Sequence, residues 1–167
     1  LADGGSPQAT LIGSGERVTA KQAALVNGAA SHALDYDDVV LAMSGHPSVP
    51  VWPALLALAE WRGGSARDVL AAFVAGFEME SRIGMLVMPA HYTVGFHSTG
   101  TLGTFGAAAA CAHLLGLDQE QWRRALGIAG AQAAGIKSMF GTMCKPLHAG
   151  KAAANGLFAA LMAERGF

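Results

Sequence analysis

Small side chains recur at helical spacing along most of the chain, and this pattern constrains the fold more than any other feature. The 167 residues include 22 glycines, and hydrophobic residues make up 52% of the sequence. Glycine and alanine four positions apart let helix backbones approach closely. Strand-like sequence is confined to residues 9–12. We therefore predict an all-α fold, a multi-helix bundle that forms one domain over residues 1–167.

Capping and stop signals predict where the helices begin and end. Thr19 and Ser65 each open a capping-box pattern, and Asp118 starts another helix. The expected helices are one at residues 20–34, one from Ser48 to Gly63, one from Ser65 to residue 87, one between Gly100 and Gly116, one from Asp118 that ends near residue 130 or 134, and one at residues 147–165.

Composition excludes several classes of partner. The net charge is -1 and no basic stripe is present, which argues against nucleic acid. The most apolar window, residues 102–117, is interrupted by His113 and is shorter than the ~20 residues that span a membrane. Cys111 and Cys144 are far apart and in no metal-binding spacing, so we expect free thiols and a cytoplasmic location. Because the chain starts at Leu1 and not at Met, we expect a fragment of a longer protein.

The segment from Thr142 to Lys151 gathers three potential cations, Lys145, His148 and Lys151, although charged residues are only 14% of the chain. Pro146 suits the first turn of a helix, so we predict a helix start near Leu147. Free backbone N–H groups at that start, together with Lys145, would form a binding corner for a carboxylate or phosphate. The alternative is a solvated helix start without function.

Reactive side chains cluster in three connections between the predicted helices, where a bundle can expose a site. They are Asp35, Asp37, Asp38 and His46 in the first, His91, Tyr92, His97, Ser98 and Thr99 in the second, and Lys145, His148 and Lys151 in the third. Each of them could instead be a solvated or capping residue, and we interpret His32 and His113 as packing residues. We expect no metal, because no two histidines have helical ligand spacing.

Four motifs resemble the N-terminal helical domain of the MmgE/PrpD family. They are the stretch from Asn27 to Asp38, His46-Pro-Ser48, Gly95-Phe-His-Ser-Thr-Gly100, and Lys145-Pro-Leu-His-Ala-Gly150. The family includes 2-methylcitrate dehydratase, cis-aconitate decarboxylase and iminodisuccinate epimerase. The resemblance implies an enzyme without a cofactor that acts on a small polycarboxylate, forms a homodimer, and has a lid domain beyond this chain.

The resemblance also implies roles for particular residues. His97 and His46 would be the acid and base, Asp35 would orient an imidazole or bind a substrate hydroxyl, and Lys145 would bind carboxylate and stabilise negative charge. His148 and Asp38 are further expected substrate-binding residues. One departure is Val39, where the family often has threonine.

We expect a hydro-lyase like 2-methylcitrate dehydratase, in propionate catabolism. The alternatives are a decarboxylase or epimerase on a related acid, and a helical interaction module without catalysis. The module would not bring Lys145, His97 and Asp35 together.

Overall fold

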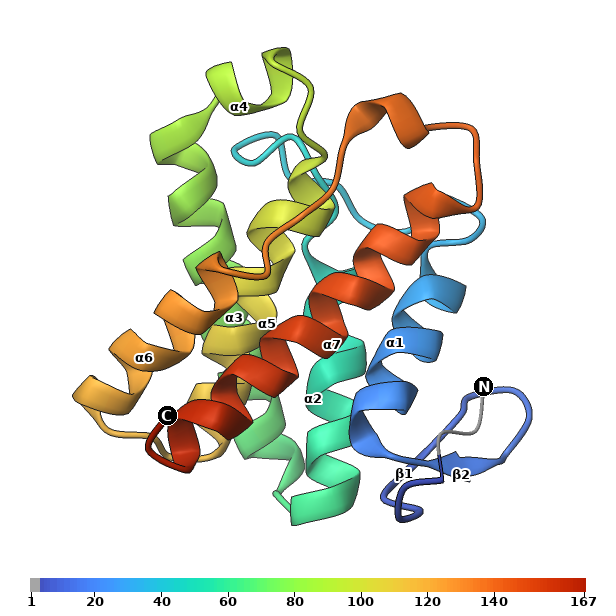
Figure 1. Ribbon diagram of the computed structural model, residues 1–167, viewed down its shortest axis with the longest axis vertical. Coiled ribbons are helices and arrows are strands. Elements are labelled where there is room, and N and C mark those ends of the chain that lie inside the picture. The colour runs from blue at the N-terminus through green and yellow to red at the C-terminus, as the bar shows by residue number, and fades with distance from the viewer. Residues whose placement is uncertain (1–3) are drawn as a thin grey trace.

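The computed structural model describes residues 4–167 and shows a bundle of helices, as the sequence predicts (Figure 1). Helices α5 and α7 lie in the middle, and α1, α2, α3 and α6 pack around them. The longer helices are α1 (Ala20–Ser31), α2 (Ser48–Arg62), α3 (Ala66–Val87), α5 (Ser98–Leu114), α6 (Gln119–Gly130) and α7 (Cys144–Glu164). The short elements are the antiparallel pair β1 (Ala9–Thr10) and β2 (Arg17–Val18), helix α4 (Ala90–Thr93) and the 3-10 turn η1 (Lys137–Met139).

Local capping explains three of the helix starts. Thr19, Ser65 and Asp118 each form a capping box, in which the side chain accepts from a backbone N–H and the third helical residue bonds back. Helix α6 ends at Gly130, the earlier of the two predicted ends. Helix α1 ends at Ser31, three residues before the predicted end, and a long irregular connection follows it.

Glycine and alanine allow α1, α5 and α7 to pack backbone against backbone. A Cβ added to Gly150 of α7 would lie 2.2 Å from the Leu25 carbonyl oxygen of α1. A Cβ added to Gly156 would lie 2.4 Å from the Ala107 Cβ of α5. These contacts set the crossings of the bundle, and the α1–α7 crossing brings the residues that follow α1 close to the first turn of α7 (Figure 1).

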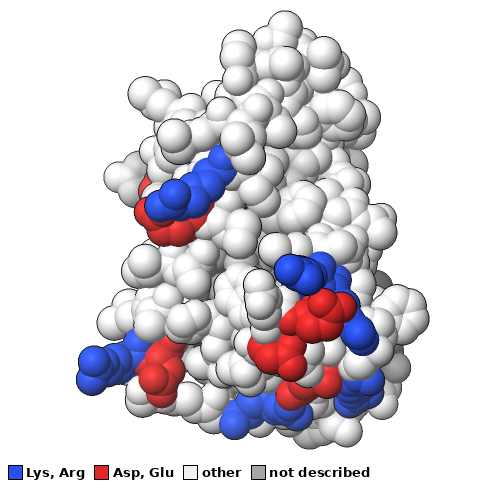
Figure 2. Space-filling model, turned by 90° about the vertical axis from the view of Figure 1, so that its left-hand side faces the viewer, with Lys and Arg blue, Asp and Glu red and all other residues white. Residues whose placement is uncertain are grey.

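Charged side chains are unevenly spread on the surface. On the face in Figure 2, most of them gather toward one end, and wide areas are uncharged. Helix α3 exposes apolar side chains, including Met85 (70% exposed) and Leu86 (83% exposed). In residues 4–167, no helix has both the length and the apolar character needed to cross a membrane.

Candidate active site

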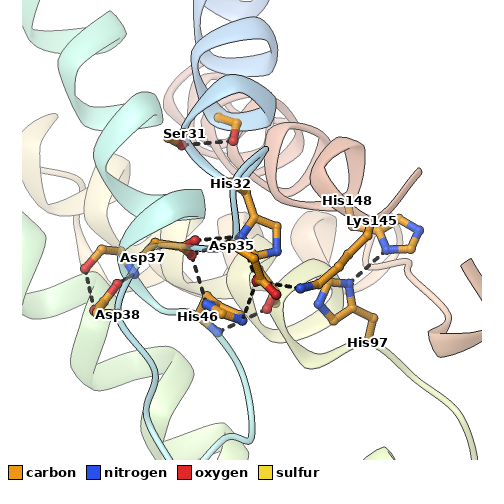
Figure 3. A network of polar contacts seen from close by, with 12 residues as sticks. Ser31, His32, Asp35, Asp37, Asp38, His46, His97, Lys145 and His148 are labelled. Atoms are coloured by element: carbon orange, nitrogen blue, oxygen red, sulfur yellow. Dashed lines mark hydrogen bonds and ion pairs between the residues drawn. The ribbon is translucent and has the colours of Figure 1, made fainter. Parts of the chain in front are cut away.

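The three connections identified in the sequence converge at one end of the bundle. The residues after α1, the residue before α5 and the first turn of α7 line a cavity of about 300 Å³, which we call the small cavity (Figure 3). Its lining residues are Asp35, Ser44, His46, Tyr92, His97, Phe140 and Lys145. All four predicted catalytic residues are therefore among them, as the enzyme interpretation requires and the interaction-module interpretation does not.

An ion pair between Asp35 and Lys145 joins two of these connections. Lys145 Nζ lies 2.5 Å from Asp35 Oδ1, and the lysine side chain is 17% exposed. The hydrogen bond from Lys145 lowers the pKa of Asp35, so this carboxylate is ionised at neutral pH. Asp35 has a φ of 54°, a left-handed conformation that aspartate tolerates better than most residues. With this backbone turn, the carboxylate contacts Lys145 while the aspartate side chain stays 55% exposed.

The predicted helix start near Leu147 is wrong, because α7 begins at Cys144. The N–H groups of Cys144 and Lys145 donate to the side chain and carbonyl of Thr142, and the N–H of Leu147 donates to the Met143 carbonyl. Pro146 has no N–H to offer. These backbone groups are thus already bonded, and the positive charge that could bind an anion here is the Lys145 ammonium.

Asp37 connects two imidazoles behind the ion pair. Its Oδ1 lies 3.0 Å from His32 Nδ1, and its Oδ2 lies 2.9 Å from His46 Nδ1. His46 Nε2 lies 3.5 Å from Asp35 Oδ1, so this ring reaches the cavity with its other nitrogen. The interpretation of His32 as a hydrogen-bonded, buried residue is confirmed, at 1% exposure. Its membership in this network was missed, although its position at the end of α1, just before an acidic turn, was a signal.

The same four residues could hold a metal ion in principle. One donor atom from each of His32, Asp35, Asp37 and His46 lies within 4.8 Å of the others. However, the Lys145 ammonium already stands 2.5 Å from Asp35, and Asp37 already contacts two ring nitrogens. A cation added here would be repelled by the ammonium, so the contacts fit a hydrogen-bonded acid and base network better.

His97 is held rigidly at the start of α5. It is 2% exposed, its backbone N–H donates to the Gly135 carbonyl, and its carbonyl accepts from the Thr101 N–H. Burial, assisted by the neighbouring His148, lowers the pKa of His97 to about 3, so the ring is neutral at pH 7. Its Nδ1 lies 2.9 Å from His148 Nδ1. His97 is therefore a neutral acid or base candidate with one nitrogen already bonded.

The two further predicted substrate-binding residues, His148 and Asp38, lie outside the small cavity. His148 lines a second, large cavity of about 600 Å³ and contacts the site through His97. Asp38 accepts from the hydroxyl of Ser48 at 2.7 Å and from its N–H at 3.4 Å, at the start of α2. His91, another member of the predicted cluster, is half-buried, and its Nε2 lies 2.7 Å from the Thr101 hydroxyl. Thr99, one of the predicted cluster, accepts from the His46 N–H at 3.0 Å and so fixes that residue.

The chain is similar in sequence to several known proteins. The chain is 39% identical over 155 residues to human cis-aconitate decarboxylase, covering 90% of this chain and 32% of that protein. It is 36% identical over 167 residues to the cis-aconitate decarboxylase-like protein oryM of Aspergillus oryzae, covering 95% and 35%. It is 34% identical over 164 residues to cis-aconitate decarboxylase of Aspergillus terreus, covering 94% and 34%.

The chain thus spans about a third of the length of these curated relatives. The family description "MmgE/PrpD N-terminal domain" matches residues 1–167. The resemblance seen in the four motifs is therefore confirmed, and the chain belongs to the MmgE/PrpD family, of which it carries the N-terminal domain.

Proposed function

We propose that this chain carries part of the active site of a lyase that acts on a small polycarboxylate by acid and base catalysis. Decarboxylation of a cis-aconitate-like acid is the first reaction to consider, because several relatives at 34–39% identity are named cis-aconitate decarboxylases. The observation that carries the proposal is the small cavity, where a lysine ammonium and two imidazoles from three separate connections face one space.

Binding of a polycarboxylate would depend on Lys145. Its ammonium is largely buried, and its partner Asp35 has a side chain that is 55% exposed. An incoming carboxylate can share the ammonium while Asp35 turns toward water, because the aspartate is the more solvated partner. A volume of about 300 Å³ lies at the lower end of small-molecule sites, which suits a small acid.

The chemistry requires a group that stabilises negative charge and a group that delivers a proton. When the bond to the departing CO₂ breaks, its electron pair moves into the adjacent double bond and toward a remaining carboxylate. A cation beside that carboxylate lowers the energy of the transition state. The far carbon then takes a proton, which His97 or His46 can supply from opposite sides of the Asp35–Lys145 pair (Figure 3).

Dehydration of 2-methylcitrate remains a second candidate, and one feature favours it. Removal of water needs a base for the C–H and a separate acid for the leaving hydroxyl. The small cavity has two imidazoles in different settings, His46 beside Asp37 and Asp35, and His97 beside His148. Such a pair of unlike groups suits two proton transfers in one turnover.

A cover over the cavity and a homodimer also remain proposals. Close in sequence to the lining residues Asp35 and Lys145 are apolar side chains that face solvent, namely Leu34 (88% exposed), Tyr36 (95% exposed) and Met143 (81% exposed). Exposed apolar groups of this size favour burial against another segment or subunit. A cover there would also exclude water during the reaction.

The test is a substrate panel with the complete polypeptide that carries this sequence. Turnover of cis-aconitate, 2-methylcitrate and citrate is measured by release of CO₂ and by change in double-bond absorbance, and epimerisation of iminodisuccinate is measured by change in optical rotation. Lys145→Met keeps the hydrocarbon stem but removes the charge, so kcat/KM should fall by roughly 10- to 150-fold, the worth of one charged hydrogen bond. Lys21→Met removes the same charge from the far end of α1 and should keep wild-type kinetics. Equal kinetics in the two variants would refute the assignment.

A further inference from the structure

Two imidazole rings meet at the boundary between the small and the large cavity. His97 lines the small cavity and not the large one, whereas His148 lines the large cavity and not the small one. Their Nδ1 atoms are 2.9 Å apart. Two ring nitrogens at this distance share a single hydrogen, because two lone pairs or two N–H groups would repel each other. In Figure 3, His97 lies between the Asp35–Lys145 pair and His148.

Two glycines hold His148 in this position. A Cβ added to Gly100 would lie 3.1 Å from His148 Cβ, and one added to Gly135 would lie 3.5 Å from His148 Cγ. Gly135 has a φ of 148°, which disfavours other residues, and its carbonyl accepts from the His97 N–H. The same short segment therefore positions both rings of the pair.

We propose that His148 is a positioning and relay residue, which passes a proton from the large cavity to His97 during the reaction. The proposal rests on the proposed lyase function, because it concerns how that reaction obtains its proton. Decarboxylation consumes one proton per turnover, since a C–CO₂ bond is replaced by a C–H bond and CO₂ leaves. The large cavity is also lined by the polar side chains of Lys151, Gln132 and Asn155, to which water can hydrogen-bond.

The relay balances without a charged intermediate on either ring. Before transfer, His97 carries a hydrogen on Nε2, and the shared hydrogen is on His148 Nδ1. As His97 Nε2 gives its hydrogen to the substrate carbon, the shared hydrogen moves to His97 Nδ1, and in the same step His148 Nε2 takes a proton from water in the large cavity, which leaves hydroxide there. When the small cavity opens again, His97 Nε2 gains a proton from water and the shared hydrogen returns to His148 Nδ1. His148 Nε2 gives its proton back to the hydroxide in the large cavity, which restores the first state.

Because of its surroundings, His97 needs a partner that protonates its Nδ1 as its Nε2 donates. Burial, His148, His32 and Lys145 all lower the pKa of His97, which is about 3, so it does not carry a spare proton at rest. His46 acts on it in the same direction. A neutral imidazole is a very weak acid unless its other nitrogen is protonated as it donates. His148 is positioned to do this, whereas a single histidine in the same place would not be an effective donor.

Two variants of the complete polypeptide separate a relay from a structural contact. His148→Asn keeps an amide that can bond to His97 Nδ1 but cannot pass a proton on. His148→Ala leaves space beside the large cavity for free imidazole. We expect kcat to fall about 100-fold or more in both variants with a smaller change in KM. Added imidazole should restore kcat of the alanine variant in a saturable way, and should not restore the asparagine variant.

The relay would be overturned by wild-type kcat in His148→Asn, or by failure of imidazole to raise kcat in His148→Ala. Nitrogen-15 NMR of the histidine rings provides a readout that needs no turnover. At rest the hydrogens should be on His97 Nε2 and His148 Nδ1, with a bare His97 Nδ1, and a resting hydrogen on His97 Nδ1 would contradict the relay. The expected tautomers in a protein that turns over none of the acids would instead refute the lyase function and leave the shared hydrogen standing.

Discussion

Replacing Gly150 with alanine tests whether the α1–α7 crossing holds the two halves of the site together. The new Cβ would lie 2.2 Å from the Leu25 carbonyl oxygen and 2.9 Å from the Ala29 nitrogen, both backbone atoms of α1. Neither atom can rotate away, so the helices must separate by roughly 1 Å to restore ordinary contact. Overpacking of this kind typically costs about 1–3 kcal/mol, and backbone obstacles put the expected cost toward the upper end.

Gly127 in the interior of α6 is the matched control, because a Cβ there meets nothing within 4 Å. Alanine is favoured over glycine in a helix by roughly 1 kcal/mol, a gain that applies to both positions. Gly127→Ala should therefore stabilise by up to about 1 kcal/mol, whereas Gly150→Ala should destabilise by about 2 kcal/mol.

Thermal unfolding of the two variants and the wild type under identical conditions measures this difference. Gly150→Ala should also lower kcat/KM, because Asp35 follows α1 and Lys145 is in the first turn of α7. If Gly150→Ala raised the melting temperature as Gly127→Ala does, the close crossing and the reasoning from it would be refuted.

Two further predictions concern the pH dependence of stability and have opposite signs. Glu80 is 0% exposed, and within residues 4–167 neither of its carboxyl oxygens has a hydrogen-bond partner. Burial, with Asp38 adding to it, raises its pKa well above the ordinary 4.5, so the folded state keeps a proton that the unfolded chain loses. Stability should fall with rising pH above 4.5 by up to about 1.4 kcal/mol per unit, and Glu80→Gln should remove this slope in denaturant titrations; an unchanged slope would contradict it. His97 has a pKa lowered from 6.5 to about 3, so the unfolded chain binds the extra proton and stability should fall on acidification below pH 6.5. In His97→Gln the loss of stability on acidification below pH 6.5 should be smaller than in the wild type. An equal loss in the two proteins would count against a buried neutral ring.

Local signals predicted the helices well because they act over a few residues. The capping boxes at Thr19 and Ser65 bring together side chain and backbone three positions apart, and both formed as predicted. The start of α7 was misplaced because a proline is tolerated anywhere in a first turn, where its missing N–H has no helical partner. Thr142 moved the start to Cys144 by accepting from its N–H, which the sequence alone did not indicate.

The composition of the site was predicted better than its internal contacts. Motifs identified Asp35, His46, His97 and Lys145, and these residues do line one cavity. Whether a residue faces that cavity depends on helix crossings, which spacing does not encode. His148 was therefore expected on the substrate, although it lies behind His97 and faces another cavity.

The connection after α1 shows the same limit. Asp35, Asp37 and Asp38 look alike in sequence, yet they pair with Lys145, with two imidazoles and with Ser48 respectively. The positive φ of Asp35 turns its side chain in a different direction from the side chains of Asp37 and Asp38. Such a conformation is set by the loop closing on the bundle, so the three roles could not be assigned from the order of residues.

The most direct test of the account is a crystal structure of the complete protein with propane-1,2,3-tricarboxylate, an unreactive acid of the proposed class. The account predicts a carboxylate on Lys145 Nζ and the carbon skeleton beside His97, inside the cavity lined by both. A ligand bound on another face, or a Lys145 side chain directed to solvent and remote from His97, would contradict it.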